Sequence, residues 1–142
     1  MTRDNLEALQ WLYEQLGRGD FWAAREILDP EIEWEWTASM MDVVGSGQVA
    51  YHGIDGVEGA IRDWFDAWDW FWIELEELIP AGDEIVAVVR RRGCAKGSRF
   101  EVETDAAEVW TMRDGKAIRY KAYDDRQEAL QAAGVGNGGA DI

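Results

Sequence analysis

Two segments, residues 100–112 and 116–123, carry the side chains best suited to chemistry. Both are rich in β-branched and aromatic residues, and the Asp114-Gly115 pair between them predicts a β-hairpin, because this pair tolerates the positive φ values of a tight turn. Successive side chains of a strand point to opposite faces of a sheet, so alternate residues share a face. One face of the predicted hairpin carries a carboxyl group among aromatic and apolar side chains: Ala106, Glu108, Trp110, Met112, Ile118, Tyr120 and Ala122.

Glu108 is the candidate for proton transfer. A carboxyl group in apolar surroundings can serve as a general acid or base, or as a neutral hydrogen-bond donor to a developing oxyanion. Tyr120 and Tyr13 are the candidate hydroxyl donors, which gives a predicted catalytic set of Glu108, Tyr120 and Tyr13. The competing interpretation is structural: Glu108 hydrogen-bonds Tyr120 or an arginine and fixes the sheet. The sequence supports both hypotheses.

The chain contains nine tryptophans, a surplus that calls for a large core, a dimer interface or a ligand cavity. Residues 32–37 alternate strictly, which places Trp34 and Trp36 on one strand face and the glutamates between them in water. Trp64 lies on the apolar stripe of a predicted helix, where a core position is the competing interpretation. The predicted ligand-binding set lines a hydrophobic pocket and comprises Trp34, Trp36, Trp110, Met112, Trp64 and Ala122.

The composition excludes several classes of partner. The chain has 142 residues, the size of one domain, and a formal net charge of −15, which repels phosphate backbones and anionic membranes. We therefore expect neither nucleic acid nor a membrane as a partner.

The single cysteine, Cys94, excludes an intramolecular disulfide and favours a reducing cytoplasm, and one histidine with one cysteine argues against a zinc site. We expect a cytoplasmic protein that uses no metal and no organic cofactor.

The elements around the hairpin begin with helices and end in a run of antiparallel strands. Helical spacing predicts helices over residues 4–16, 21–28, 55–68 and 125–134, with Asp4, Asp20, Asp55 and Asp125 as the capping residues. Alternation and turn residues predict a loop over residues 38–48 and strands over residues 32–37, 49–53, 70–79, 84–95, 99–112 and 116–123. This order predicts an α+β domain over residues 1–134, in which a curved antiparallel sheet wraps around helices and encloses a cone-shaped cavity. Residues 135–142 are expected to form a flexible glycine-rich tail.

Five segments resemble the SnoaL-like family of the nuclear transport factor 2 and ketosteroid isomerase-like superfamily: residues 16–21, 28–34, 51–57, 109–116 and 123–130. The most specific is Val-Trp-Thr-Met-Arg-Asp-Gly-Lys at 109–116. The resemblance runs from about Asp4 to Gly134 and implies the cone-shaped α+β fold, a homodimer and a pocket for a small hydrophobic molecule. It also implies an acid–base enzyme of the isomerase or polyketide cyclase type that acts on a hydrophobic carbonyl compound.

The catalytic positions of these relatives are only partly kept. The resemblance places the general-base aspartate of ketosteroid isomerases at Trp36 and their oxyanion-hole aspartate at Glu108, while their oxyanion-hole tyrosine falls one residue from Tyr13. The acid–base aspartate of SnoaL-type cyclases falls at Ala122, and a histidine two residues before it falls at Tyr120. Because principal catalysts are replaced, the alternative function is a non-catalytic module for hydrophobic-ligand binding or dimerisation.

Overall fold

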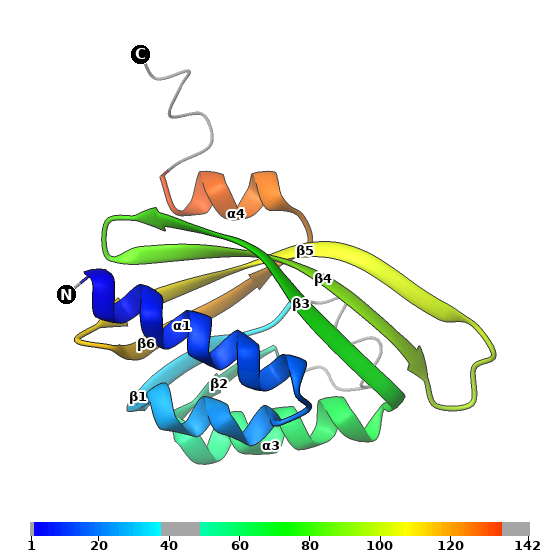
Figure 1. Ribbon diagram of the computed structural model, residues 1–142. Coiled ribbons are helices and arrows are strands. Elements are labelled where there is room, and N and C mark those ends of the chain that lie inside the picture. The colour runs from blue at the N-terminus through cyan, green and yellow to red at the C-terminus, as the bar shows by residue number, and fades with distance from the viewer. Residues whose placement is uncertain (1, 38–48, 135–142) are drawn as a thin grey trace.

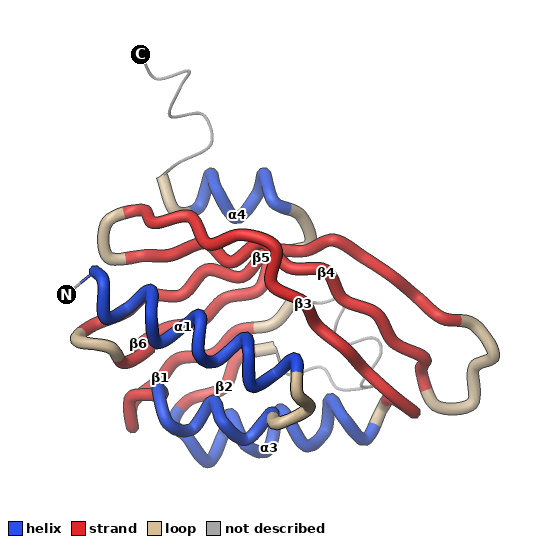
Figure 2. Tube along the Cα trace, viewed as in Figure 1, coloured by secondary structure: helices blue, strands red, loops and turns tan. Residues whose placement is uncertain are grey.

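The computed structural model describes residues 2–37 and 49–134, with side chains from Asn5 onward. The elements follow in this order: α1 (Thr2–Gly17), the 3-10 helix η1 (Phe21–Ile27), β1 (Leu28–Glu35), β2 (Ala50–His52), α3 (Gly53–Asp66), β3 (Trp68–Ala81), β4 (Glu84–Ala95), β5 (Glu101–Arg113), β6 (Lys116–Tyr123) and α4 (Arg126–Ala132). One curved six-stranded sheet has α1 and α3 against its inner face and α4 against its outer face (Figure 1). Figure 2 shows the same layers by type of secondary structure.

The strands pair in the order β2-β1-β6-β5-β4-β3. All neighbours are antiparallel except β1 and β6, which run parallel. The predicted α+β class with a cone-shaped sheet is confirmed, and the parallel pair is the departure from the all-antiparallel sheet that we expected. The register sets Trp34 of β1 opposite Tyr120 of β6, and Tyr120 opposite Trp110 of β5. Three aromatic residues therefore form a row across three adjacent strands.

The turn between β5 and β6 has the predicted hairpin geometry. Asp114 and Gly115 have φ values of 54° and 80°, the left-handed conformations of a type I′ turn. The Gly115 N–H donates to Oδ1 of Asn5 at 2.7 Å, which ties the turn to α1. A register shift just after the turn corrects one expectation: Ala117 is fully buried and Ile118 only half-buried, whereas strict alternation predicted Ile118 on the inner face.

The predicted helix caps were right at one end of the chain only. The Asp125 carboxylate accepts a hydrogen bond from the Glu128 N–H at 2.8 Å, as a capping residue does. Asp20 occupies the N-cap position of η1 as predicted, but its side chain makes no capping hydrogen bond, and the cap predicted at Asp55 is wrong because α3 already begins at Gly53. Similarly, α1 begins two residues before Asp4.

Both prolines of the chain lie inside strands. Pro30 lies inside β1, which begins at Leu28, and Pro80 lies inside β3. β3 lies at the edge of the sheet and has a neighbouring strand on one side only. Proline, which has no backbone N–H, is tolerated in edge strands because the open side has no hydrogen bonds to lose. The predicted strands over residues 84–95 and 116–123 match β4 and β6. The predicted loop over residues 38–48 and tail over residues 135–142 lie outside the described residues.

The sheet has two apolar faces of different extent. The inner face of β4 to β6 packs on α1, η1 and α3 in one large core, and the outer face carries a smaller cluster in which Val86, Val88, Ala107 and Val109 surround Ala129 of α4. Glu108 is the only buried charged or polar residue in the described part of the chain. Among the described helices, none is long and apolar enough to cross a membrane.

Candidate functional site

Glu108 projects from the middle of β5 into the inner core, where its side chain is almost fully buried. Its Oε1 accepts a hydrogen bond from the Tyr13 hydroxyl and its Oε2 accepts one from the Tyr120 hydroxyl. The Arg91 guanidinium donates to Oε2 at 3.1 Å, in an ion pair whose two side chains are 11% and 7% exposed. The predicted catalytic set is therefore brought together in space, with Arg91 as a fourth member.

Four elements supply this cluster, and the pattern of each element explains why. Tyr13 lies on the apolar stripe of α1, beside the fully buried Leu12 and Leu9. Glu108 and Tyr120 are diagonal neighbours on β5 and β6, because Glu108 pairs with Ala122 two residues further on. The indole N–H of Trp110 donates to the Tyr13 hydroxyl oxygen at 2.9 Å, so this hydroxyl is both donor and acceptor.

Burial sets the protonation of the two tyrosines. Loss of hydration raises the pKa of Tyr13 well above its usual value, and the negative charge of Glu108 raises it further. The same two causes, in the same order, raise the pKa of Tyr120, against a smaller opposing effect of Arg91. Both hydroxyls therefore remain neutral hydrogen-bond donors at physiological pH.

Arg91 keeps its charge although only 11% of its side chain is exposed. Loss of hydration acts to lower its pKa, but the charge of Glu108 and the hydrogen bond to it outweigh this, and the pKa lies above the usual arginine value. The sequence prediction left Arg91 out of the site. A signal was available, because Ile85, Ala87 and Val89 of β4 alternate on the inner face and Arg91 continues the series.

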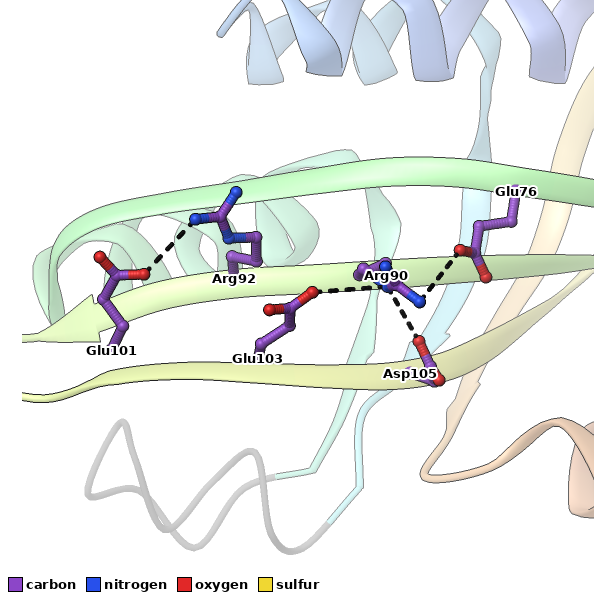
Figure 3. A network of polar contacts seen from close by, with 6 residues as sticks. All are labelled: Glu76, Arg90, Arg92, Glu101, Glu103 and Asp105. Carbon is purple, nitrogen blue, oxygen red and sulfur yellow. Dashed lines mark hydrogen bonds and ion pairs between the residues drawn. The ribbon is translucent and has the colours of Figure 1, made fainter.

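Arg90 and Arg92, the neighbours of Arg91, point to the opposite face of the sheet (Figure 3). There Arg90 pairs with Asp105 at 3.2 Å and with Glu76 and Glu103 at 3.6 Å, and Arg92 pairs with Glu101 at 3.5 Å. These side chains are 38–70% exposed. The outer network therefore lies in water and is separate from the site.

Aromatic rings enclose a small cavity against Glu108, which we call the inner cavity. Its volume is about 80 Å³. Trp34 stacks on Tyr120 with ring centroids 3.8 Å apart and an interplanar angle of 22°, and Trp110 meets Tyr120 edge-on at 4.7 Å. Trp36 contacts Trp64 at 5.4 Å. The rings fill most of the cone and leave little free volume.

Most of the predicted site residues line this cavity. Those that line it are Trp34, Trp36, Trp64, Glu108, Trp110 and Tyr120. Tyr13, Met112 and Ala122 are buried near it but are not part of its wall. The wall also contains Arg91 and several apolar residues of α1, η1 and α3 that the prediction did not name.

Two buried donors lack partners among the described residues. They are the indole nitrogens Nε1 of Trp34 and Trp68. An unsatisfied buried N–H costs about 1–3 kcal/mol, so each marks a place where an acceptor would be stabilising.

The remaining reactive side chains lie away from the inner cavity. His52 is exposed and faces Glu31, with Nε2 to Oε1 at 3.2 Å. The Cys94 thiol donates to the backbone oxygen of Ser98 at 3.4 Å. Residues 2–37 and 49–134 contain no group of three or more histidine, cysteine, aspartate or glutamate side chains arranged to hold a metal ion.

A family model described as the SnoaL-like domain matches residues 9–120 of the chain. A sequence search of curated proteins gave no match.

Several solved structures share the fold. An NTF2-like protein of unknown function from Burkholderia pseudomallei K96243 is 25% identical, with a TM-score of 0.75 over 90% of this chain and 95% of that one. TerC, co-crystallised with polyporic acid, is 24% identical, with a TM-score of 0.75 over 86% of this chain and 92% of its own. A proposed SnoaL-like polyketide cyclase from Jannaschia sp. CCS1 is 19% identical, with a TM-score of 0.69 over 92% and 91% of the two chains.

Proposed function

The chain belongs to the SnoaL-like domain family, and we propose that it is an acid–base enzyme of the isomerase or cyclase type that acts on a hydrophobic carbonyl compound. The observation that carries this proposal is a carboxylate in the wall of an aromatic cavity, held by two neutral hydroxyls and one guanidinium. Acid–base groups at enzyme sites are typically buried and held by charged and hydrogen-bonding neighbours in this way.

Glu108 is the proton-transfer group in this proposal. Its carboxylate takes a proton from a carbon next to the ligand's carbonyl group and returns it to another carbon of the same molecule, so that no atoms are gained or lost. The charge that develops on the carbonyl oxygen needs a hydrogen-bond donor. Tyr120, which lines the cavity and stays neutral, can turn its hydroxyl from Glu108 to that oxygen.

Tyr13 and Arg91 act through Glu108. Tyr13 does not line the cavity, and its hydroxyl fixes Oε1 of the carboxylate. Arg91 pairs with Oε2 and compensates the buried negative charge. These contacts hold the carboxylate in one orientation, which is what proton transfer to a bound molecule requires. Trp34, Trp36 and Trp110, which are all buried, form apolar walls of the same space.

The second candidate function is a non-catalytic module for a hydrophobic ligand. Two observations favour it: both oxygens of Glu108 already have partners, and the inner cavity has only about 80 Å³. Pockets for small molecules typically have ~300–1,000 Å³. An enzyme must therefore move aromatic side chains to admit its substrate into this cavity, whereas a binding module could hold its ligand elsewhere.

The test measures the rate at which the protein exchanges carbon-bound hydrogen next to the carbonyl group of hydrophobic ketones for deuterium in D₂O. This exchange is the first half of an isomerisation and needs no knowledge of the natural substrate. We expect Glu108→Gln to lower the catalysed rate ~10²–10⁴-fold, the usual contribution of one acid–base group.

The matched control is Glu103→Gln, which changes a carboxylate of the same strand on the outer face. It should leave the exchange rate at the native value. Equal rates for Glu108→Gln and the native chain, with both proteins folded by circular dichroism, would refute catalysis by Glu108 and favour the binding module.

A further inference from the structure

One indole N–H is hydrogen-bonded to a hydroxyl that holds Glu108. Nε1 of Trp110 donates to the Tyr13 hydroxyl oxygen at 2.9 Å, and the same hydroxyl donates to Oε1 of Glu108. Trp110 and Glu108 are two residues apart on β5 and point to the same face of the sheet. A side chain of α1 therefore connects two side chains of one strand.

The direction of this chain of hydrogen bonds is fixed by the chemistry of its members. An indole nitrogen can only donate a hydrogen bond, whereas a tyrosine hydroxyl donates one and also accepts. The Tyr13 proton therefore cannot point at Trp110, and it lies on the side of Glu108. Because hydrogen bonds that follow one another in the same direction polarise each other, the Trp110 N–H strengthens the bond from Tyr13 to the carboxylate.

The Trp110 ring is held in place on several sides. It is 2% exposed, and its edge-to-face contacts with Tyr13, Trp34 and Tyr120 have centroid distances of 6.4, 5.8 and 4.7 Å. A large ring in a close-packed core cannot turn without displacing its neighbours. The indole N–H therefore points at Tyr13 before any ligand binds.

The two oxygens of Glu108 have different neighbours. Oε2 accepts hydrogen bonds from Tyr120 and Arg91, and both of these side chains line the inner cavity. Oε1 accepts a hydrogen bond from Tyr13, which does not line the cavity. Oε2 is therefore the oxygen on the side of the cavity, while Oε1 is tied to α1.

We propose that Trp110 is a positioning residue for Glu108: acting through Tyr13, it holds Oε1 in place, so that the carboxylate presents Oε2 to the inner cavity. The inference rests on the proposed function for the use of Oε2 in proton transfer. The chain of hydrogen bonds that holds Oε1 can be tested without any activity.

The first test replaces the Trp110 side chain by that of 3-benzothienylalanine, an isostere of tryptophan in which sulfur takes the place of the N–H. The readout is the ¹³C NMR signal of the Glu108 carboxyl group in the ligand-free protein, assigned by its absence in Glu108→Gln. The signal should move, because Tyr13 has lost the donor that polarises its bond to Oε1. The matched control is the same isostere at Trp34, whose buried N–H has no partner among the described residues, and it should leave the signal in place.

A second background shows whether the effect passes through Tyr13. In Tyr13→Phe the hydroxyl is absent, so the isostere at Trp110 should cause no further change in the Glu108 signal. A signal that stays in place with the isostere at Trp110 alone, or that moves equally with the isostere at Trp34, would overturn the proposal. A shift that persists in Tyr13→Phe would also overturn it, because that shift would arise from the ring and not from the hydrogen bond.

The second test measures kcat and KM for the deuterium exchange of hydrophobic ketones. The isostere at Trp110 should lower kcat about fivefold, the rate equivalent of one hydrogen bond, and leave KM at its native value. Trp70→Phe changes an exposed tryptophan outside the inner cavity and should leave both constants unchanged.

Two kinetic results would contradict the positioning role. An unchanged kcat, or a higher KM at an unchanged kcat, would show that Trp110 only shapes the cavity wall. Failure of the proposed function has a different signature, namely equal exchange rates for Glu108→Gln and the native chain. The NMR test then decides alone whether Trp110 holds Oε1.

Discussion

The two faces of β4 place neighbouring arginines in opposite environments. Arg91 points inward and pairs with Glu108 in a site where both side chains are at most 11% exposed. Arg90 points outward, is 42% exposed and lies within ion-pair distance of three carboxylates (Figure 3). The chemical groups are the same on both faces, and only the surroundings differ.

This difference decides what each ion pair can do. In water, charges are screened and an exposed pair contributes little to stability. In the core, loss of either partner leaves an uncompensated buried charge, and the pair is sensitive to every change beside it. The outer ion pairs therefore offset a few of the many negative charges on the surface, while the inner pair holds the carboxylate of Glu108 in a fixed position. Alternation along β4 separates Arg91 from its two neighbours, but only the structure shows which carboxylates each arginine meets.

The largest effect is expected from breaking the inner pair. Arg91→Met removes the partner of Glu108 and should lower the free energy of unfolding by about 3–5 kcal/mol, because a buried carboxylate is left without its counter-charge. The measurement is urea unfolding followed by circular dichroism. Arg90→Met is the matched outer-face control, and it should leave the unfolding midpoint at its native position. Equal losses in both variants would contradict the contrast between the faces.

A smaller effect is expected at high pH. The folded protein keeps the Tyr120 proton above the pH at which the unfolded chain loses it, near 10, since the folded pKa is raised. The unfolded state then binds fewer protons, so this contribution to stability, present in full below pH 10, is lost as pH rises. The difference in unfolding free energy between the native chain and Tyr120→Phe should shrink by about 1.4 kcal/mol per pH unit above 10. A difference that stays constant from pH 9 to 11 would show that Tyr120 ionises normally.

The smallest effect is expected on the outer face. A double-mutant cycle with Arg92→Met and Glu101→Gln should give a coupling energy of about 0.2–1 kcal/mol, the usual range for exposed pairs, and 1 M NaCl should reduce it. A coupling of the size expected for Arg91 and Glu108 would mean that exposure does not separate the two faces.

Local rules predicted those parts of the fold that depend on short segments. The alternation along residues 84–95 and 116–123 and the Asp114-Gly115 turn gave β4, β6 and the last hairpin as they occur. The same rule failed at Ile118, because a register shift is set by how two strands meet and not by either strand alone. The 3-10 helix η1 begins at Phe21, directly after Asp20 as predicted, but the Asp20 side chain makes no capping hydrogen bond, and α3 begins two residues before Asp55.

The candidate site was predictable in its residues more than in its shape. The face pattern placed Glu108, Trp110 and Tyr120 together and Tyr13 was predicted as a further hydroxyl donor, whereas Arg91 enters the site only with the structure. No sequence rule gives the volume that remains between large rings, because it depends on how Trp34, Trp36 and Trp64 stack. The unpartnered Nε1 atoms could not be foreseen for the same reason: they depend on ring orientation in the finished core.

The most direct test of the central claim follows the ¹³C NMR signal of the Glu108 carboxyl group during titration with the hydrophobic ketones of the exchange assay. The signal is assigned by its absence in Glu108→Gln, and Glu103 on the outer face serves as the internal reference. If Glu108 faces the reacting molecule, its signal moves in a saturable way while that of Glu103 stays in place. A Glu108 signal that stays constant with every ketone, including any that the protein exchanges, would show that this carboxylate only fixes the sheet.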